Sequence, residues 1–362
     1  MLDVSCVKRN AEQMSSRMKE FGVNLRPHIK THKCVEVARI QTEGHSGGIT
    51  VSTLAEARAF LSNGFRDITY AVPIEHGKFA EACGISKMCE RFAVITDNAQ
   101  VPKALNEAAH DAGIKLDVFL KVDCGYHRCG VEPHTEEAFQ IPQSIADSSN
   151  LNFAGILTHA GHSYNVHSQE EVFEIAGRER DVMKNFAQEL IEKGVNVPVV
   201  SVGSTPTMTS VDNLDGINEA RPGNYIFFDA FQATLGSCSF NDCALTVLSA
   251  VVHHDRTRRK IILDAGAIAL SKDRGAVQID SNCGYGRVLD LDGNDLGLNV
   301  GSLSQEHGVI YLEDEEVFNQ LTVGSRVRVL ANHSCLTAAQ YTHYNVIEGE
   351  SIVDQWQIHG GW

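Results

Sequence analysis

The chain has 362 residues, of which 43% are hydrophobic and 21% are charged, and its formal net charge at pH 7 is −15. This composition is typical of a globular protein large enough for two domains, and the acidity argues against nucleic acid or an anionic membrane as the main partner. No stretch approaches the roughly 18 consecutive apolar residues of a membrane span, and the first residues do not predict a signal peptide.

The first two-thirds of the sequence alternates short apolar strands with helical patterns. Helices are predicted over residues 5–20, 34–42, 54–63, 78–88, 98–112, 135–148 and 168–193. Strands are predicted over residues 23–30, 48–52, 67–72, 92–96, 115–122, 153–159, 199–203 and 225–229. Such alternation predicts a parallel sheet, and eight strands predict a closed (β/α)8 barrel of the TIM type.

The pattern changes after about residue 240, where long helices end. Short strands are predicted over residues 244–253, 260–264, 308–313, 326–330, 346–347 and 352–357. We therefore expect an α/β protein with an N-terminal barrel over residues 5–238 and a mainly β domain made of residues 239–362 together with residues 1–4.

The ten cysteines are scattered, and none forms a Cys-x-x-Cys pair. Free thiols in a reducing compartment fit this distribution better than a disulfide framework does. The expected location is therefore cytoplasmic.

The first candidate catalytic residue is Lys30, at the end of the first predicted strand and near Arg26, His28, His32 and Lys33. Neighbouring cations disfavour a charged amine and would lower its pKa. A partly neutral lysine is what Schiff-base chemistry with a carbonyl cofactor requires. The alternative is an exposed basic strand end with no catalytic role.

Other distinctive segments follow later strands of the predicted barrel, at the carboxyl edge where barrel enzymes place their active sites. Small residues at 203–207 and at Gly223-Asn224 would let backbone N–H groups approach a phosphate, although such a run taken singly is more often just a turn. Arg128 could hold an anionic ring substituent, and its alternative is a salt bridge to Asp123.

A candidate metal pair, His333 and Cys335, follows the predicted strand at 326–330. In an extended chain residues i and i+2 face the same side, so this imidazole and thiol could share one ion. That donor set favours zinc, and two protein ligands leave positions open for water or substrate. The alternative is a buried histidine and a buried cysteine without metal.

Together these segments resemble a known family. The lysine motif at 26–33 is similar to the pyridoxal-phosphate (PLP) lysine motif of the D-serine dehydratase and D-threonine aldolase group, which belongs to the alanine-racemase-like enzymes of fold type III. Further similar segments cover nearly the whole chain, at residues 51–57, 123–130, 159–164, 203–207, 222–229, 305–308 and 333–335.

The resemblance implies a homodimer with shared active sites, PLP on the barrel and a small D-amino acid as substrate. Lys30 would bind PLP covalently and Arg128 would contact its ring oxygen. His333 and Cys335 would bind the metal. Four further residues would lie near the cofactor or its phosphate: Tyr164, Thr205, Gly223 and Asn224.

With cysteine at position 335 the chain resembles the zinc-dependent dehydratase branch of the family, because the aldolase branch typically has aspartate at this metal-ligand position. The implied function is a PLP- and Zn²⁺-dependent D-serine dehydratase that yields pyruvate and ammonia. The alternatives are a dehydratase of D-threonine or 3-hydroxyaspartate, a D-threonine aldolase, and a non-catalytic PLP-binding protein.

The sequence departs from the family pattern in two places. Leu157 stands where some members have tyrosine, which puts one cofactor contact in doubt. Members usually also have a further strand before the residue that is Met1 here, so an edge of the β domain is expected to be shorter.

Overall fold

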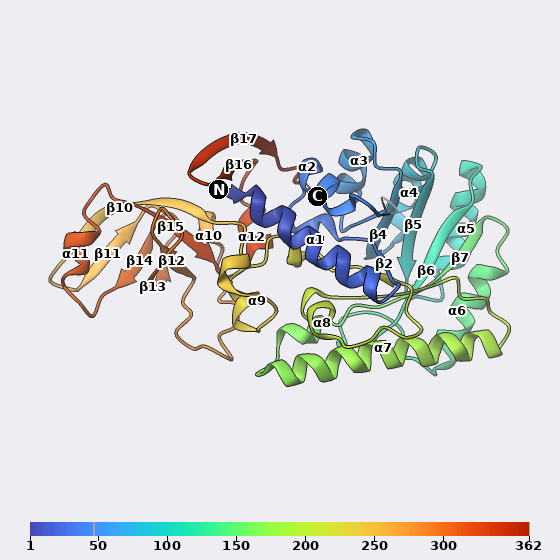
Figure 1. The fold of residues 1–362 in the computed structure, drawn as a ribbon. Coiled ribbons are helices and arrows are strands. Elements are labelled where there is room, and N and C mark those ends of the chain that lie inside the picture. The colour runs from blue at the N-terminus through green and yellow to red at the C-terminus, as the bar shows by residue number, and fades with distance from the viewer. Residues whose placement is uncertain (46–47, 362) are drawn as a thin grey trace. The chain divides into compact units, whose positions relative to one another are not determined.

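The computed structural model describes residues 1–45 and 48–361 (Figure 1). The chain divides into two compact units. One, here called the barrel unit, contains Glu12–Ser163, Glu170–Gly223 and the segment from His359. The other, here called the β unit, contains Met1–Ala11, Tyr164–Gln169 and Asn224–Ile358.

The barrel unit contains an eight-stranded parallel sheet with the order β2-β9-β8-β7-β6-β5-β4-β3. Its two end strands are connected by a parallel bridge between His28 and Thr50, where the Thr50 N–H donates to the Pro27 carbonyl at 2.9 Å. The predicted fold class is confirmed. The strands are β2 (Asn24–Leu25), β3 (Ile49–Val51), β4 (Asp67–Pro73), β5 (Arg91–Thr96), β6 (Leu116–Lys121), β7 (Leu151–Leu157), β8 (Val199–Val202) and β9 (Glu219–Ala220).

Helices alternate with these strands, as the periodicity predicted. They are α1 (Val4–Glu20), α2 (Val35–Thr42), α3 (Leu54–Ser62), α4 (Phe79–Ser86), α5 (Val101–Ala112), α6 (Glu136–Ala146), α7 (Gln169–Glu192) and α8 (Thr205–Ser210), with 3₁₀ turns η1 (Ile29–Thr31), η2 (His76–Lys78) and η3 (Gly161–Tyr164). Local sequence explains several helix starts. Thr53 and Thr135, for example, each accept a backbone N–H of the first turn that follows.

Two of the predicted strands differ from the structure. The eighth strand is β9, whereas Asn224–Ile226 forms a 3₁₀ turn (η4) and Asp229 caps the short helix α9 (Ala230–Thr234). The run 225–228 is apolar because it is buried, and a short buried run does not distinguish strand from turn. The first strand ends at Leu25, because Pro27 has no N–H for a sheet and the His28 side chain caps the next turn.

The β unit contains a closed antiparallel barrel of strand order β10-β11-β14-β13-β12-β15 and a three-stranded sheet β1-β16-β17. The strands are β1 (Leu2–Asp3), β10 (Val247–Asp255), β11 (Lys260–Leu263), β12 (Gly286–Leu289), β13 (Asp295–Leu303), β14 (Gly308–Tyr311), β15 (Arg326–Ala331), β16 (His343–Glu348) and β17 (Ser351–Gln357). Short helices α10 (Ala267–Leu270), α11 (Val317–Gln320) and α12 (Ser334–Ala338) and the turn η5 (Phe240–Asp242) connect them.

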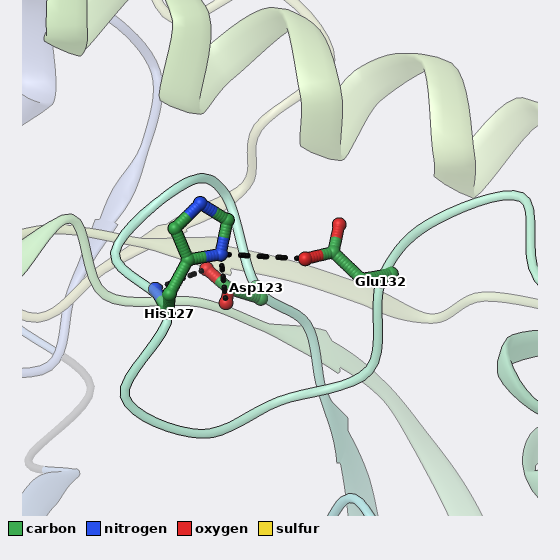
Figure 2. A group of neighbouring side chains, drawn as sticks. All are labelled: Asp123, His127 and Glu132. Carbon is green, nitrogen blue, oxygen red and sulfur yellow. Dashed lines mark hydrogen bonds and ion pairs between the residues drawn. The ribbon is translucent and has the colours of Figure 1, made fainter.

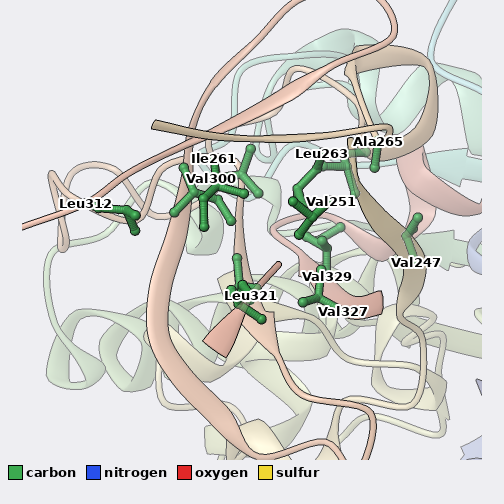
Figure 3. Packing of buried hydrophobic residues seen from close by; sticks show 14 of the residues in the cluster. Val247, Val251, Ile261, Leu263, Ala265, Val300, Leu312, Leu321, Val327 and Val329 are labelled. Carbon is green, nitrogen blue, oxygen red and sulfur yellow. The ribbon is translucent and has the colours of Figure 1, made fainter. Parts of the chain in front are cut away.

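Alternating buried residues of these strands fill the small barrel, among them Val251, Ile261, Leu263, Val300 and Val329 (Figure 3). Strands β12 and β13 were not predicted, since the residues around them are rich in Gly, Asp and Asn, which usually indicate turns. Among the described residues no helix has the length and apolarity needed to cross a bilayer.

Candidate active site

Lys30 lies in the turn η1, beyond the end of β2, so the prediction of a strand-end lysine is wrong in detail. Its side chain is exposed in the barrel unit. The turn is held by His28, whose Nδ1 accepts the Lys30 N–H at 3.4 Å and whose Nε2 lies 3.3 Å from the Ser52 hydroxyl. The histidine before Lys30 therefore shapes the backbone that carries the amine.

The basic residues next to Lys30 in sequence are occupied elsewhere. Arg26 is buried and pairs with Glu219 at 2.7 Å and with Asp67 at 2.8 Å. Lys33 pairs with Glu56 at 3.3 Å. These two cations are neutralised by carboxylates, so they do not supply the positive surroundings that the sequence predicted for Lys30.

The two imidazoles of the motif are neutral near pH 7. Burial lowers the pKa of His32 to about 4, against smaller opposing effects of its bonds to Gln41 and Cys34. Burial, followed by the nearby positive charge of Lys30, holds the pKa of His28 well below its ordinary value. A neutral imidazole can accept a hydrogen bond, and both do so from backbone N–H groups.

The cations around Lys30 come from other strands of the barrel. Burial and the charges of Lys30 and Lys121 hold the pKa of His159 well below its ordinary value, and Arg128 adds to this effect. Lys121, at the end of β6, is itself buried, and burial together with Arg221 lowers its pKa to about 8. The tertiary fold thus gathers the positive charge that the sequence motif alone does not supply, and such a site suits an anionic ligand.

Arg221 is a site residue that the sequence analysis missed. It is 5% exposed and follows β9, and its Nε has no hydrogen-bond partner among the described residues. A buried guanidinium N–H without an acceptor is costly, and an anionic or acceptor ligand would satisfy it. In the sequence, its position directly before Pro222 and Gly223 could have indicated that Arg221 belongs to the site.

The segments that the sequence predicted to contact a phosphate contain Gly203, Thr205 and Gly223. A Cβ at Gly223 would lie 2.8 Å from the His28 carbonyl oxygen, and one at Gly203 would lie 2.9 Å from the Arg221 nitrogen. Gly203 also has φ +125°, which disfavours other residues. Glycine at 203 lets the loop after β8 pack against the segment after β9, and glycine at 223 lets that segment pack against the lysine turn. Thr205, which is buried, begins α8.

Arg128 lies in the loop after β6, exposed, with its guanidinium 5.0 Å from the centre of the Tyr126 ring. The alternative salt bridge to Asp123 does not form among the described residues. Asp123 Oδ1 instead accepts the N–H groups of Gly125, Tyr126 and His127 at 2.9–3.1 Å.

Asp123, His127 and Glu132 form a group of possible metal ligands within this loop (Figure 2). His127 Nδ1 lies 3.1 Å from Asp123 and 3.3 Å from Glu132, and both His127 and Glu132 are exposed. Since Asp123 is already bonded to three backbone N–H groups, we interpret this group as the contacts that shape the loop.

Tyr164 and Asn224 belong to the β unit. Tyr164 contacts the ring of Phe231 edge-on at 5.7 Å. Asn224 donates its amide N–H to Asp229 at 2.8 Å, to the Ser334 hydroxyl at 3.1 Å and to the Cys335 thiol at 3.5 Å. The side chain expected near the phosphate therefore contacts the segment of the predicted metal pair.

Cys335 lies in the first turn of α12 and His333 immediately precedes that helix, so the predicted extended geometry is wrong. The two side chains still meet, because a hydrogen bond joins them. His333 Nδ1 lies 2.7 Å from Asp273 Oδ2. Burial opposes the charged imidazole, but the bonds to Asp273 and Cys335 outweigh it and raise the His333 pKa to about 11.

This donor set fits a metal ion. A carboxylate on the second ring nitrogen of a histidine is the usual support for a metal ligand, because it fixes the ring and makes it a stronger donor. Asp229, buried, supports the same segment: its Oδ2 accepts the N–H of Ser334 at 2.9 Å and the Ser334 hydroxyl at 3.1 Å. The sequence analysis assigned no role to Asp273 or Asp229.

Leu157, where some relatives have tyrosine, is buried at the end of β7 and packs in an apolar cluster with Ala93, Ile95, Phe119 and Ala154. It fills core volume and offers no polar group. The contact expected from a tyrosine is therefore not available at this position.

Comparison with known proteins decides the family. The family described as alanine racemase, N-terminal domain, matches residues 2–230, and a putative serine dehydratase domain matches residues 244–347. The chain belongs to the alanine-racemase-like family, in the group of D-serine dehydratase and its relatives.

Within this family of fold-type III PLP enzymes, one similar protein is the D-threo-3-hydroxyaspartate dehydratase of Delftia sp. (strain HT23), 36% identical over 100% of this chain and 97% of the relative. Another is the D-serine dehydratase of Dictyostelium discoideum, 34% identical over 99% of this chain and 95% of the relative. These relatives are lyases, and so is this member of the family.

Solved structures of the family agree. The Delftia dehydratase superposes with a TM-score of 0.96 at 36% identity, covering 100% of this chain and 97% of the other. A cysteine-to-alanine mutant of a D-threo-3-hydroxyaspartate dehydratase, described as metal-free, superposes with a TM-score of 0.95. Alanine racemase of Clostridium difficile, at 16% identity and a TM-score of 0.71, shares the fold.

Proposed function

We propose that this protein is a PLP- and zinc-dependent dehydratase that converts D-serine to pyruvate and ammonia. The observation that carries the proposal is the His333–Cys335 pair supported by Asp273, in a chain that also presents Lys30 at a cationic barrel site. A racemase of the same fold would have no need of a metal pair. The D-serine dehydratases among the relatives support the same substrate.

The barrel unit fits PLP. Lys30 would bind the cofactor covalently, Arg128 would hold its ring oxygen, and the unpartnered Arg221 Nε would find an acceptor on it. Thr205 and Gly223 would accommodate the phosphate. The family resemblance also assigns Tyr164 and Asn224 to cofactor binding, and these two assignments stay predictions. When bound, PLP withdraws electrons from Cα of an amino acid and so makes its proton acidic.

Lys30 Nζ is the proposed base that would take the Cα proton of the substrate. Its turn is held by His28, which accepts the Lys30 backbone N–H and is neutral, so it adds no competing charge. His333 and Cys335 would hold Zn²⁺, which as a Lewis acid makes the β-hydroxyl a better leaving group.

The second candidate substrate is 3-hydroxyaspartate of D configuration, because the Delftia relative at 36% identity is named for it. D-threonine and retro-aldol cleavage are further candidates, since relatives include aldolases. We further propose a cytoplasmic homodimer. The domain boundary at residues 238 and 239 likewise stays a prediction.

The deciding experiment is product analysis with D-serine, D-threonine, D-threo-3-hydroxyaspartate and the L forms, with and without a chelator. Pyruvate from D-serine that disappears on chelation is the expected result. If 3-hydroxyaspartate yields oxaloacetate with a higher kcat/KM than D-serine yields pyruvate, 3-hydroxyaspartate is the substrate. If the products are glycine and an aldehyde, the reaction is aldol cleavage and not dehydration. Sedimentation of a fully active 39.6 kDa monomer would contradict the homodimer.

A further inference from the structure

Glu179 is a buried carboxylate on α7 that none of the steps above uses. It is 1% exposed and lies on the buried face of the helix, at the same spacing as Ala176, Met183, Phe186 and Leu190. A glutamate on such a face is exceptional, because burying a carboxylate costs free energy unless its oxygens are hydrogen-bonded.

The Glu179 Oε1 joins two loops at the carboxyl edge of the sheet. It accepts the Ala160 N–H, after β7, and the Gly203 N–H, after β8, each at 3.1 Å. Burial raises the pKa of Glu179, and the bond from the Gly203 N–H opposes that rise. One atom of a helix side chain therefore sets the separation of the two loops.

Two further contacts join the same loops. His159 Nδ1 lies 3.0 Å from the Gly203 carbonyl oxygen, so the neutral imidazole donates from this nitrogen. The Ser163 and Ser204 hydroxyls lie 3.0 Å apart. With Glu179, these bonds fix Gly203 through both its N–H and its carbonyl group.

The bond to Glu179 has a consequence for anion binding. It occupies the N–H of Gly203, and the Thr207 hydroxyl accepts the N–H of Ser204 at 3.1 Å. These two N–H groups are therefore directed into the protein, and the turn continues into Thr205 at the start of α8. Where Thr205 lies depends on how Gly203 is held.

We infer that Glu179 is a positioning residue for the phosphate of PLP: it touches no ligand and acts by fixing the Gly203–Thr205 turn through the Gly203 N–H. This inference rests on the proposed function, because it assumes that PLP is the ligand. It predicts that the loss of Glu179 weakens recognition of the phosphate group more than recognition of the pyridine ring.

The test compares the dissociation constants of PLP and of pyridoxal, which lacks the phosphate, for the full chain and its variants. Glu179→Ala is expected to lower the preference for PLP over pyridoxal by roughly tenfold or more, because both N–H groups lose their acceptor. Glu179→Gln keeps an acceptor oxygen and should recover most of the preference.

Leu190→Ala is the matched control. It removes buried volume from the same face of α7 but contacts neither loop through hydrogen bonds, so it should lower stability and leave the preference for PLP unchanged. If Glu179→Ala does not fold, Glu179→Asp replaces it, because a side chain one methylene shorter cannot reach both N–H groups. The Glu179→Asp variant should therefore also lose the preference for PLP over pyridoxal.

A second readout needs no cofactor. The amide protons of Ala160 and Gly203 should exchange slowly with solvent in the unsubstituted protein and faster in Glu179→Asp. A wild-type preference for PLP over pyridoxal in Glu179→Ala or Glu179→Asp would overturn the inference alone. Failure of the unsubstituted protein to bind PLP would instead refute the proposed function.

Discussion

The imidazole Nδ1 of His333 lies 2.7 Å from the carboxylate of Asp273, and this contact orients the ring that is also hydrogen-bonded with Cys335. Sixty residues separate the two in sequence. The predicted metal pair therefore has a carboxylate partner, Asp273, that no local sequence motif indicated.

Asp273→Asn is expected to weaken zinc binding by about 10–100-fold, because the neutral amide makes His333 a poorer donor and holds its ring less firmly. Zinc affinity measured by competition with a chelating dye checks this. Asp292→Asn is the control, because it removes the same charge from an exposed aspartate of the β unit. It should leave zinc affinity unchanged. Equal affinity in the two variants would show that Asp273 plays no part.

Removal of the metal should separate binding of PLP from elimination. Chelation is expected to leave the yellow colour of the PLP-loaded protein and abolish pyruvate release, because only the departure of the hydroxyl needs a Lewis acid. Cys335→Asp should shift the preference from zinc toward manganese, since a carboxylate is a harder ligand than a thiolate. Undiminished pyruvate production by a His333→Ala, Cys335→Ala double variant would refute the metal proposal.

Borohydride reduction of the PLP-loaded protein should fix the label on Lys30. Lys33 is paired with Glu56, and Lys121 is buried at the end of β6, so both are less accessible to a cofactor. Peptide mapping by mass spectrometry gives the position directly, and Lys30→Ala should take up no label. Label on Lys121 would move the proposed base to that residue.

Gly223→Ala should lower the free energy of unfolding by about 1–3 kcal/mol and reduce PLP uptake, because the new methyl group would meet the His28 carbonyl at 2.8 Å and displace the lysine turn. Gly84→Ala is the matched control. It lies in α4 with nothing within 4 Å of the new Cβ, so it should be neutral or slightly stabilising. Thermal unfolding and PLP titration of the two variants test this.

Stability should fall as the pH drops from about 6.5 toward 4, with a contribution from His32. Its folded pKa is about 4 and its unfolded value 6.5, so below 6.5 the unfolded chain binds a proton that the folded chain does not. The loss due to His32 approaches about 3 kcal/mol at pH 4. His32→Asn should flatten the unfolding free energy over this range, and an unchanged pH slope would contradict the buried neutral state.

The sequence by itself determined the order of elements and the chemistry of the site. The strand and helix alternation over the first two-thirds predicted the barrel, because helical and strand periodicities of long segments follow directly from which face is buried. The motifs around Lys30 and at His333 and Cys335 identified the family, since residue types at close spacing are visible without a fold.

Only the tertiary structure decided which groups surround these residues. Arg26 and Lys33 are cations beside Lys30 in sequence, but carboxylates neutralise both of them. The positive charge near the site comes instead from Lys121 at the end of β6 and from Arg221 after β9. Contacts such as His333–Asp273 or Glu179–Gly203 join distant segments, and electrostatic and hydrogen-bond energies depend on distance in space rather than along the chain.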